Sequence, residues 1–352
     1  MKSQPTYLKN AWYVAALESE VGGGLTPVKV LGEPVVLYRK QDGSLAALED
    51  ACPHRKLPLS MGRLKGDEVE CGYHGLMFDC TGTCTKVPGA EKIPHVARVR
   101  SYPVHARYGF VWIWMGEARL ADPAKITHVD FWGEPGWGHN QPDSMLFECN
   151  YLYVCDNLLD PSHVSWVHQS SFGGAGTEDT PIETTVTDTS VTAWRWMMNT
   201  KPAPFYAPLL KFQGTCDRKQ HYEMRIPSLM LARAIFTPAG HGGPGKPDHP
   251  DVFYMDSYNF LTPIDDKTTR YFWFQMRNVR ADDAELSRQM NVSIRSVFEE
   301  DRVVLNAVQK GMDAMLTPNL DLKIDNAPLR FRRRLAQLIE AEQAAAPRAA
   351  AE

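Results

Sequence analysis

Two short pairs of cysteine and histidine constrain this chain more than any other feature. Cys52 and His54 form the first pair, and Cys71 and His74 form the second, so the pattern is C-x-H, a gap of sixteen residues, then C-x-x-H. Thiolate sulfur and imidazole nitrogen are ligands of zinc and of iron–sulfur clusters. The fold must therefore bring two loops together around one metal centre.

The mixed composition of each pair separates two kinds of centre. Structural zinc usually takes its cysteines from one pair and its histidines from the other. In a Rieske [2Fe–2S] centre one iron carries two thiolates and the other carries two imidazoles, so each loop supplies one ligand of each kind. The spacing favours a Rieske centre, and a structural zinc module in a binding protein is the alternative from another functional class.

The block resembles the Rieske domain of the Rieske non-haem iron oxygenases, in which glycine follows the second histidine as Gly75 does here. All four ligand positions of the family motif are present. The resemblance implies one [2Fe–2S] cluster, with Cys52 and Cys71 on one iron and His54 and His74 on the other.

Length and patterning predict two domains in an α+β protein. The chain has 352 residues with 43% hydrophobic content, which suits about two buried cores. Short apolar runs with turn signals predict an all-β domain over residues 1–122, and a mixture of strands and helix predicts a second domain over 123–340. The resemblance makes the second sheet antiparallel and helix-grip-like. Residues 341–352 are expected to be a flexible tail.

Local patterns locate several elements within these domains. An apolar stripe over residues 282–311 predicts a long helix at the end of the second domain, with Asp282 as its N-cap. The expected strands of the first domain include Val35–Arg39 and Leu45–Glu49, joined at Asp42-Gly43, and a later strand at Val99–Val104.

Charge and cysteine usage exclude several kinds of partner. The formal net charge is −4, from 38 basic and 42 acidic side chains that are well mixed, so we expect neither nucleic acid nor anionic lipid as a partner. No stretch approaches the roughly 20 apolar residues of a membrane span, and the first ten residues lack a signal-peptide core. Seven cysteines do not form a secreted disulfide framework. We therefore expect a cytoplasmic protein.

A second group of polar residues lies early in the second domain. Asp156, Asp160 and His163 are four and three residues apart, so they share one face if the segment is helical. His168 is five residues beyond His163, which requires a bend or a helix end before the two can meet. Taken alone, a polar helix face with two unrelated histidines explains the pattern equally well.

Asp301 supplies a carboxylate for the same site. It falls on the apolar stripe of the long helix, between Val297 and Phe298 on one side and Leu305 and Val308 on the other. An ionised carboxylate is costly there unless it binds a cation. Two imidazoles and one carboxylate that leave open positions form the facial triad of non-haem Fe(II) enzymes that activate dioxygen.

The family resemblance extends to these residues. Rieske oxygenases carry the motif D-x-x-H-x4-H and, far along the chain, the motif E-D-[KR]-V-V. In this chain the second motif is Glu300-Asp301-Arg302-Val303-Val304. The resemblance implies that His163, His168 and Asp301 bind one mononuclear Fe(II). It also implies that Asp160 bridges His163 to His74 of a neighbouring subunit, in a homotrimer. Asn157, one turn earlier, is a candidate for the same site, with a structural role as the equal alternative.

Within the family, the motifs N-A-W-Y-V-A-A, Y-H-G-L-x-F-D and V-W-I-W-M-G resemble the O-demethylases and aryl-sulfonate methyl monooxygenases. The resemblance implies a terminal oxygenase that hydroxylates a small aromatic substrate with O2. O-demethylation of a methoxylated aromatic acid is the first expectation. Ring hydroxylation or cis-dihydroxylation of an aromatic carboxylate, as in phthalate-type oxygenases, is the alternative.

Electrons must come from another protein. The sequence has neither G-x-G-x-x-G after a strand nor the four-cysteine spacing of plant-type ferredoxins. We therefore expect a reductase partner that carries flavin and a ferredoxin-type cluster and takes electrons from NADH. Apolar and basic residues are mixed over 205–236, as in a pocket for an aromatic acid, and core packing with solvated charges explains the mixture equally well. The candidate anchors for its acid group are Arg218, His221, Arg225 and Arg233.

Overall fold

The structure is a computed structural model that describes residues 7–173, 180–245, 247, 249–314 and 317–345. It divides into two compact units, one of residues 1–127 and 262–266 and the other of residues 128–261 and 267–352. The predicted boundary after residue 122 lies close to this division.

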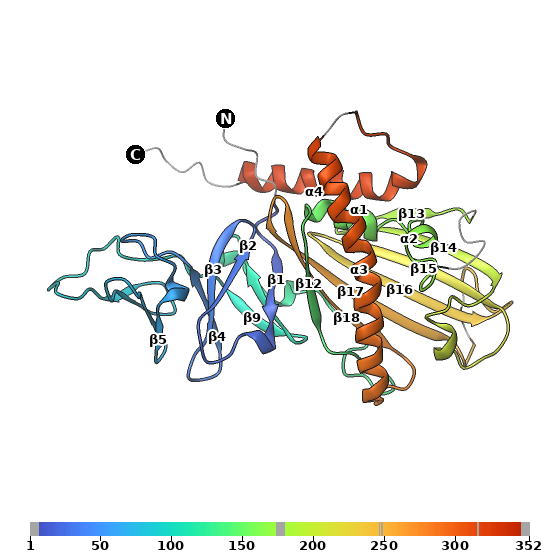
Figure 1. Cartoon of the computed structure of the whole chain (residues 1–352), viewed down its shortest axis with the longest axis horizontal. Helices are drawn as coiled ribbons and strands as arrows, with labels where there is room; N and C mark the ends of the chain where they lie inside the picture. The colour runs from blue at the N-terminus through green and yellow to red at the C-terminus, as the bar shows by residue number, and fades with distance from the viewer. Residues whose placement is uncertain (1–6, 174–179, 246, 248, 315–316, 346–352) are drawn as a thin grey trace. The chain divides into compact units, whose positions relative to one another are not determined.

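The described residues of the first unit form three small antiparallel sheets (Figure 1). Their strand orders are β2-β3-β4, β5-β6-β7-β8 and β1-β10-β9. The strands are β1 (Trp12–Leu17), β2 (Thr26–Val30), β3 (Glu33–Arg39), β4 (Leu45–Glu49), β5 (Arg63–Lys65), β6 (Glu68–Glu70), β7 (Met77–Phe78), β8 (Cys84–Lys86), β9 (Val104–Arg107) and β10 (Phe110–Trp114). The predicted all-β first domain is thus confirmed.

The hairpin β3–β4 forms at the predicted place. Arg39 pairs with Leu45, and Gly43 in the turn has φ +85°, a conformation that favours glycine. The strand expected at Val99–Val104 is wrong in its bounds, because the ladder with β10 begins only at Val104. Before it, Ser101 makes only an isolated bridge to Leu48.

The second unit contains one large sheet with the order β11-β18-β17-β16-β15-β14-β13, while β12 also pairs with β18. The pairings β11–β18, β12–β18, β13–β14, β14–β15, β15–β16 and β16–β17 are all antiparallel, as expected. Its strands are β11 (Gly138–His139), β12 (Asp143–Phe147), β13 (Glu183–Val186), β14 (Ser190–Thr200), β15 (Cys216–Arg225), β16 (Leu229–Pro238), β17 (Phe253–Asp265) and β18 (Thr268–Arg277). Long neighbouring strands give this unit a broad face on which a site can be built.

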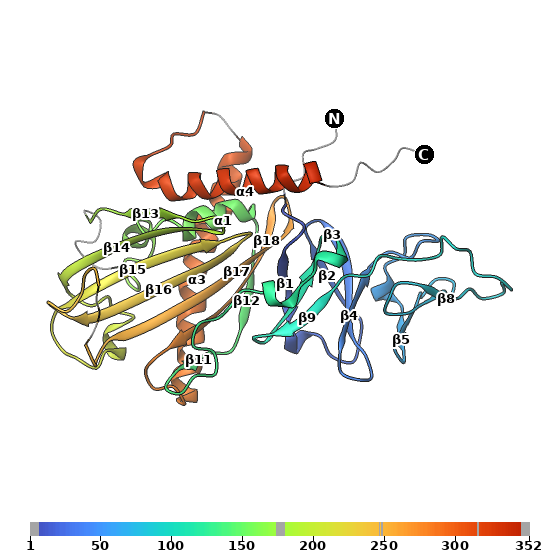
Figure 2. The same cartoon turned by 180° about the vertical axis from the view of Figure 1, so that it is seen from behind.

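Within the described residues, the α-helices that accompany this sheet are α1 (Tyr151–Leu158), α2 (Val164–Val167), α3 (Ala284–Ala314) and α4 (Asn326–Ala345). Helix α3 crosses one face of the sheet, in front in Figure 1 and behind in Figure 2, and it contacts α1 and β12. Short 3-10 turns occur at Glu18–Glu20, Leu59–Met61, Ala118–Leu120, Pro123–Lys125, Ala207–Leu209 and Lys323–Asp325.

Helix α3 confirms the predicted long helix, with two corrections. Asp283, not Asp282, caps it, because its Oδ1 accepts from the N–H of Leu286 at 2.8 Å. Val308 is 39% exposed, and the buried position in that turn is Gln309. The buried face moves from the predicted position 308 to position 309, because a helix has 3.6 residues per turn and not a whole number.

Helix α4 was not predicted and corrects the expected tail, since residues 341–345 are helical. It contacts α1, β13 and β14. Its Arg332 forms an ion pair with Asp156, with Nε at 2.9 Å from Oδ1. Asp156 therefore faces α4 and not the polar group of Asp160 and His163. Residues 346–352 of the predicted tail lie outside the described residues.

The Asp156–Arg332 pair leads to a stability prediction. Burial raises the pKa of Asp156 and Arg332 partly offsets this, so the carboxylate depends on its partner. We expect Arg332→Ala to lower the free energy of unfolding by about 2 kcal/mol in urea titrations, a value reduced for partial exposure. Arg333→Ala, at an exposed position on the same helix, is the control and should change it by less than about 0.5 kcal/mol. Equal effects of both changes would contradict the assignment.

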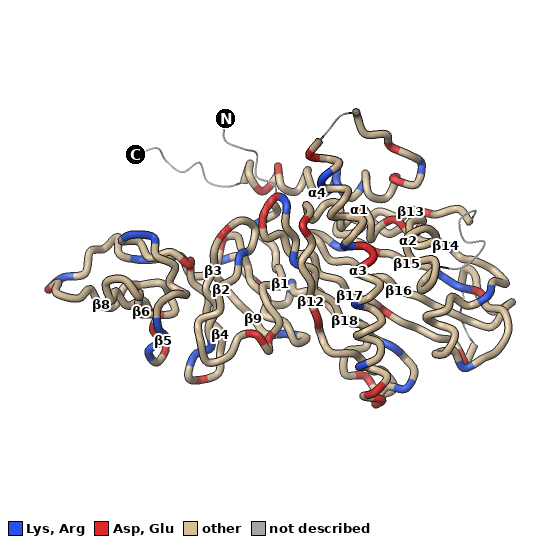
Figure 3. Tube along the Cα trace, viewed as in Figure 1, with Lys and Arg blue, Asp and Glu red and all other residues tan. Residues whose placement is uncertain are grey.

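Charged residues of both signs are interspersed along the described chain (Figure 3). Among the described residues, no helix has the length and apolar character needed to cross a membrane.

Candidate active site

The two Cys/His loops of the first unit have the same backbone hydrogen bonds. The N–H of Cys52 donates to the carbonyl of Leu57 at 2.9 Å, and the N–H of Cys71 donates to that of Leu76 at 2.8 Å. The carbonyl of each cysteine accepts from the residue four positions on, which has a positive φ: Lys56 at 60° and Gly75 at 73°. The glycine after the second histidine thus serves a tight left-handed turn.

These loops place the donor atoms in a sulfur pair and a nitrogen pair. Cys52 and Cys71 are each 2% exposed and contact each other, whereas both histidines are exposed. The Nδ1 atoms of His54 and His74 are 3.2 Å apart. Burial, together with the thiol of Cys71, raises the pKa of Cys52, so a cation is needed to hold the thiolates. Buried thiols and exposed imidazoles suit a Rieske cluster.

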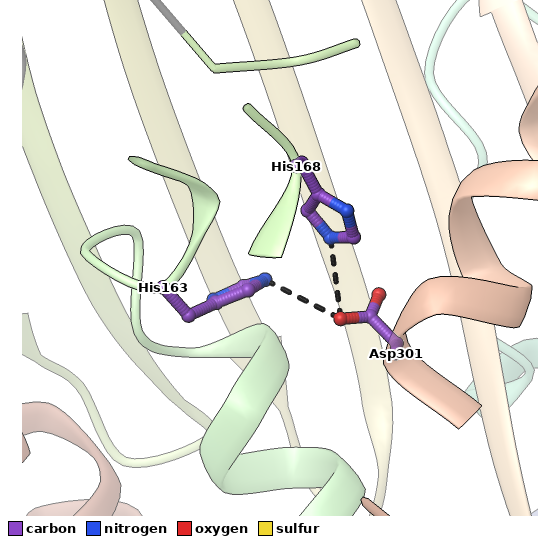
Figure 4. A group of neighbouring side chains, drawn as sticks. All are labelled: His163, His168 and Asp301. Carbon is purple, nitrogen blue, oxygen red and sulfur yellow. Dashed lines mark ion pairs between the residues drawn. The ribbon is translucent and has the colours of Figure 1, made fainter. Parts of the chain in front are cut away.

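The second site lies where α1, α2 and α3 meet the large sheet. His163 and His168 flank the four-residue helix α2, at its N-cap and C-cap, so a helix end brings them together as the spacing required. Asp301 lies on the buried face of α3. Figure 4 shows the two imidazoles directed at this carboxylate. Nε2 of His168 is 3.2 Å and Nε2 of His163 is 3.7 Å from Oδ1 of Asp301.

This donor set fits a metal ion. Among the described residues, it is the one group of three metal-ligating side chains whose donor atoms all lie within 4.8 Å of one another. His168 and Asp301 are each 2% exposed. Burial lowers the pKa of His168, but Asp301 and Glu300 raise it more, so the protein stabilises positive charge here. Two neutral imidazoles and one carboxylate are the donors expected of a non-haem Fe(II) site.

Each imidazole is oriented through its other nitrogen. Nδ1 of His168 donates to Oε2 of Glu300 at 2.6 Å, and Nδ1 of His163 donates to the backbone carbonyl of Asp160. A proton on Nδ1 leaves the lone pair of Nε2 free for a cation. No role was predicted for Glu300 from the sequence. Its position beside Asp301 was the available signal.

The side chain of Asp160 lies elsewhere than expected. Ser162 donates to both carboxylate oxygens, from its N–H at 2.8 Å and its hydroxyl at 2.7 Å. The contact from Asp160 to His163 is made by the carbonyl and not by the carboxylate, which corrects that part of the prediction. An Asp side chain that accepts a hydrogen bond from the backbone N–H two residues further on commonly forms a turn of this kind.

Asn157 is close to the donor group. Its Nδ2 donates to Oδ1 of Asp301 at 3.3 Å, and its Oδ1 is buried without a hydrogen-bond partner among the described residues. Asn157 therefore holds Asp301 in place through its Nδ2, and its Oδ1 remains available to accept a hydrogen bond.

A largely apolar cavity of about 60 Å³ adjoins His163, His168 and Asp301. Phe172, Tyr206, Ile294 and Phe298 are among the aromatic and aliphatic side chains that line it, and the polar lining includes Tyr222, Ser257 and Asn259. Ser257 and Asn259 were missed, although their alternation along β17 could have placed them on one face.

The Glu300–His168 contact leads to a prediction at the site. Glu300→Gln should weaken iron retention by about 10- to 100-fold, because a neutral amide orients His168 less well and makes it a weaker donor. The measurement is iron loss to a chelator. Glu299→Gln is the matched control, since Glu299 pairs with Arg302 on the same helix. Unchanged retention in the Glu300 variant would contradict the role given to that contact.

Comparison with known proteins identifies the families of both domains. The Rieske [2Fe-2S] domain family matches residues 11–103, and the vanillate O-demethylase oxygenase C-terminal domain family matches residues 147–341. The fold and sites therefore define a Rieske oxygenase component. The chain belongs to the vanillate O-demethylase oxygenase family. The match to the Rieske domain family supports the predicted [2Fe–2S] cluster over a structural zinc site.

Several of the similar proteins are oxygenase components or subunits. The toluene-4-sulfonate monooxygenase iron–sulfur subunit of Comamonas testosteroni is 36% identical, over 86% of this chain and 88% of that protein. A vanillate O-demethylase oxygenase subunit of a Pseudomonas species is 35% identical over 96% of each. Dicamba monooxygenase bound to 3,6-dichlorosalicylic acid aligns with a TM-score of 0.87 and 30% identity, covering 96% of this chain and 99% of that chain. The same enzyme with non-heme iron and dicamba aligns with a TM-score of 0.79.

Proposed function

We propose that this chain is a terminal oxygenase that O-demethylates a methoxylated aromatic acid. The overall reaction joins an aryl methyl ether, O2, two electrons and two protons to give a phenol, formaldehyde and water. The observation that carries the proposal is the group His163, His168 and Asp301 beside a largely apolar cavity. The relatives that act on vanillate and dicamba support the substrate class.

We assign the cofactor ligands from the donor geometry. Cys52, His54, Cys71 and His74 would hold the [2Fe–2S] cluster, and His163, His168 and Asp301 would hold one Fe(II). When bound, the cluster would supply electrons one at a time, and the Fe(II) would supply the site of dioxygen activation.

The surrounding residues exclude water and hold the donors in place. Val297 and Phe298, one turn before Asp301 on α3, line the cavity with apolar surface and keep competing donors away. Glu300 and the carbonyl of Asp160 hold protons on the Nδ1 atoms. Asn157 positions Asp301, and this is the catalytic contribution that we propose for it.

We further propose a reductase partner that carries flavin and a ferredoxin-type cluster and is reduced by NADH. A homotrimer would let the carboxylate of Asp160 reach His74 of the next subunit. Two features of the Rieske unit support docking there: His54 and His74 are exposed, and an apolar groove of about 460 Å³ lies beside them, with Val96 81% exposed on its wall. All seven cysteines are free, which suits the reducing cytoplasm.

The test is a substrate screen with a surrogate reductase that measures NADH use, O2 use and products together. Formaldehyde and phenol in equal amounts from a methoxybenzoate support O-demethylation. A hydroxymethyl product from toluene-4-sulfonate would instead favour methyl hydroxylation, which the relative from Comamonas makes the second candidate. A ring diol would favour the phthalate-type reaction and overturn the proposal.

A further inference from the structure

Arg218 is a buried arginine on β15 that the proposed chemistry does not use. Its guanidinium carbon lies beside two neighbouring aromatic rings, 5.4 Å from the ring centre of Tyr206 and 5.3 Å from that of Phe236. The residue is 3% exposed. Its Nη2 donates to the backbone carbonyl of Phe172 at 3.0 Å.

The charge of Arg218 is not balanced within the protein. Among the described residues, no acidic side chain forms an ion pair with it, and its Nε is buried without a hydrogen-bond partner. The neighbouring Asp217 accepts instead from the backbone N–H groups of Asn199, Gly240 and Gly242. A buried cation without a counter-charge is costly, although aromatic faces offset a part of that cost.

The other basic candidates of this region are already compensated or uncharged. Arg233 pairs with Asp256 and Asp130, and Arg225 pairs with Glu223. Burial lowers the pKa of His221 to about 4, so it is neutral at physiological pH. Arg218 is therefore the candidate that could accept an anion from outside.

Arg218 also lies beside the cavity of the iron site. It shares a face of β15 with Tyr222, four residues on, which lines the cavity. Two of the residues that it contacts, Phe172 and Tyr206, line the cavity as well. The ring of Phe172 is in turn 6.1 Å from the ring of His168. Phe172 and Tyr206 therefore adjoin both the cavity and Arg218.

We propose that Arg218 binds the anionic group of the substrate, a carboxylate or sulfonate on an aromatic ring. This inference rests on the proposed function for the identity of the reaction, but binding can be tested without turnover. The planar guanidinium, with Nε unpaired, suits both acid groups. The aromatic rings beside the guanidinium suit the aromatic ring of such a substrate.

The test is calorimetric binding to the metal-loaded protein under argon. Two pairs of probes differ in charge and little in shape: 4-methoxybenzoate against 4-methoxybenzamide, and toluene-4-sulfonate against toluene-4-sulfonamide. The wild type should prefer the anion of each pair. Arg218→Gln should lose roughly 100-fold in affinity for the anions and little for the amides. Arg218→Lys should show an intermediate loss of affinity, since lysine keeps the positive charge but lacks the planar guanidinium that can donate two parallel hydrogen bonds.

Arg225→Gln is the matched control, because Arg225 lies on the same strand and is already paired with Glu223. The Tm without ligand should not fall in Arg218→Gln, since the change removes an uncompensated buried charge. If that variant fails to fold, Arg218→Lys carries the comparison. Equal losses for anions and amides, unchanged anion affinity, or a wild type that binds no probe would each overturn the proposal.

Turnover is scored separately. Anions that bind through Arg218 but are not oxidised would contradict the proposed reaction while the anion site stands. Oxidation of the amides and acids alike, with equal affinity in Arg218→Gln, would leave the oxygenase proposal intact and reject the anion site.

Discussion

Asp301→Ala is expected to release the mononuclear iron and to leave the [2Fe–2S] cluster in place. Asp301 is the one anionic donor of the three, and its Oδ1 is within 3.7 Å of both Nε2 atoms. Without it, two neutral imidazoles remain in a largely apolar cavity. Iron should fall from about three to about two atoms per chain, given the two irons of the cluster. Turnover should fall by at least about 10³-fold.

Iron analysis together with the visible spectrum of the cluster measures this result. Asp313→Ala is the matched control, because Asp313 is on the same helix but pairs with Lys267 at an exposed position. That variant should keep both its iron content and its turnover. An Asp301 variant that retains its third iron and its turnover would reject the ligand assignment.

Asp160→Asn is expected to keep both metal centres and to lower reductase-coupled turnover by at least about 100-fold. The backbone carbonyl, not the side chain, contacts His163, so the imidazole keeps its orientation in the variant. An asparagine oxygen can still accept from Ser162. The variant lacks the negative charge of Asp160. We propose that this charge contacts His74 of a neighbouring subunit.

The experiment compares two rates: reduction of the cluster by dithionite, and its reoxidation in the presence of substrate and O2. The variant should reduce normally and reoxidise slowly. Ser162→Ala is the control, because it removes one hydrogen bond to Asp160 and keeps the charge, so turnover should stay within about threefold. Normal reoxidation in Asp160→Asn would reject the relay and leave Asp160 with a role in the turn alone.

The Cys/His block shows how much of a site a sequence can determine. Its ligands come from two short loops, and the mixed pairing alone favours one kind of cluster. The β3–β4 hairpin was predictable for the same reason, because alternation, turn residues and strand length are local properties. The start of β9 was not, because it depends on where Val104 meets its partner on β10.

The second site needed more than local pattern. His163 and His168 are close in sequence, and a helix end was expected between them. Asp301 is far along the chain, and only its place on an apolar stripe suggested a metal. The sequence could not show that Asp156 turns to Arg332 on α4, or that Glu300 orients His168. Both contacts join residues more than 100 positions apart.

By itself, therefore, the sequence determined the α+β organisation, the two sets of candidate ligands and the class of oxygenase. The tertiary structure decided which neighbour each polar side chain meets. Asp160 was assigned to His163 by its motif, yet its carboxylate binds Ser162. Arg218 was one of four equivalent anchors in the sequence, and it became distinct only when the others were seen to be paired or neutral. Charge compensation depends on distance in space, and a linear pattern does not contain that distance.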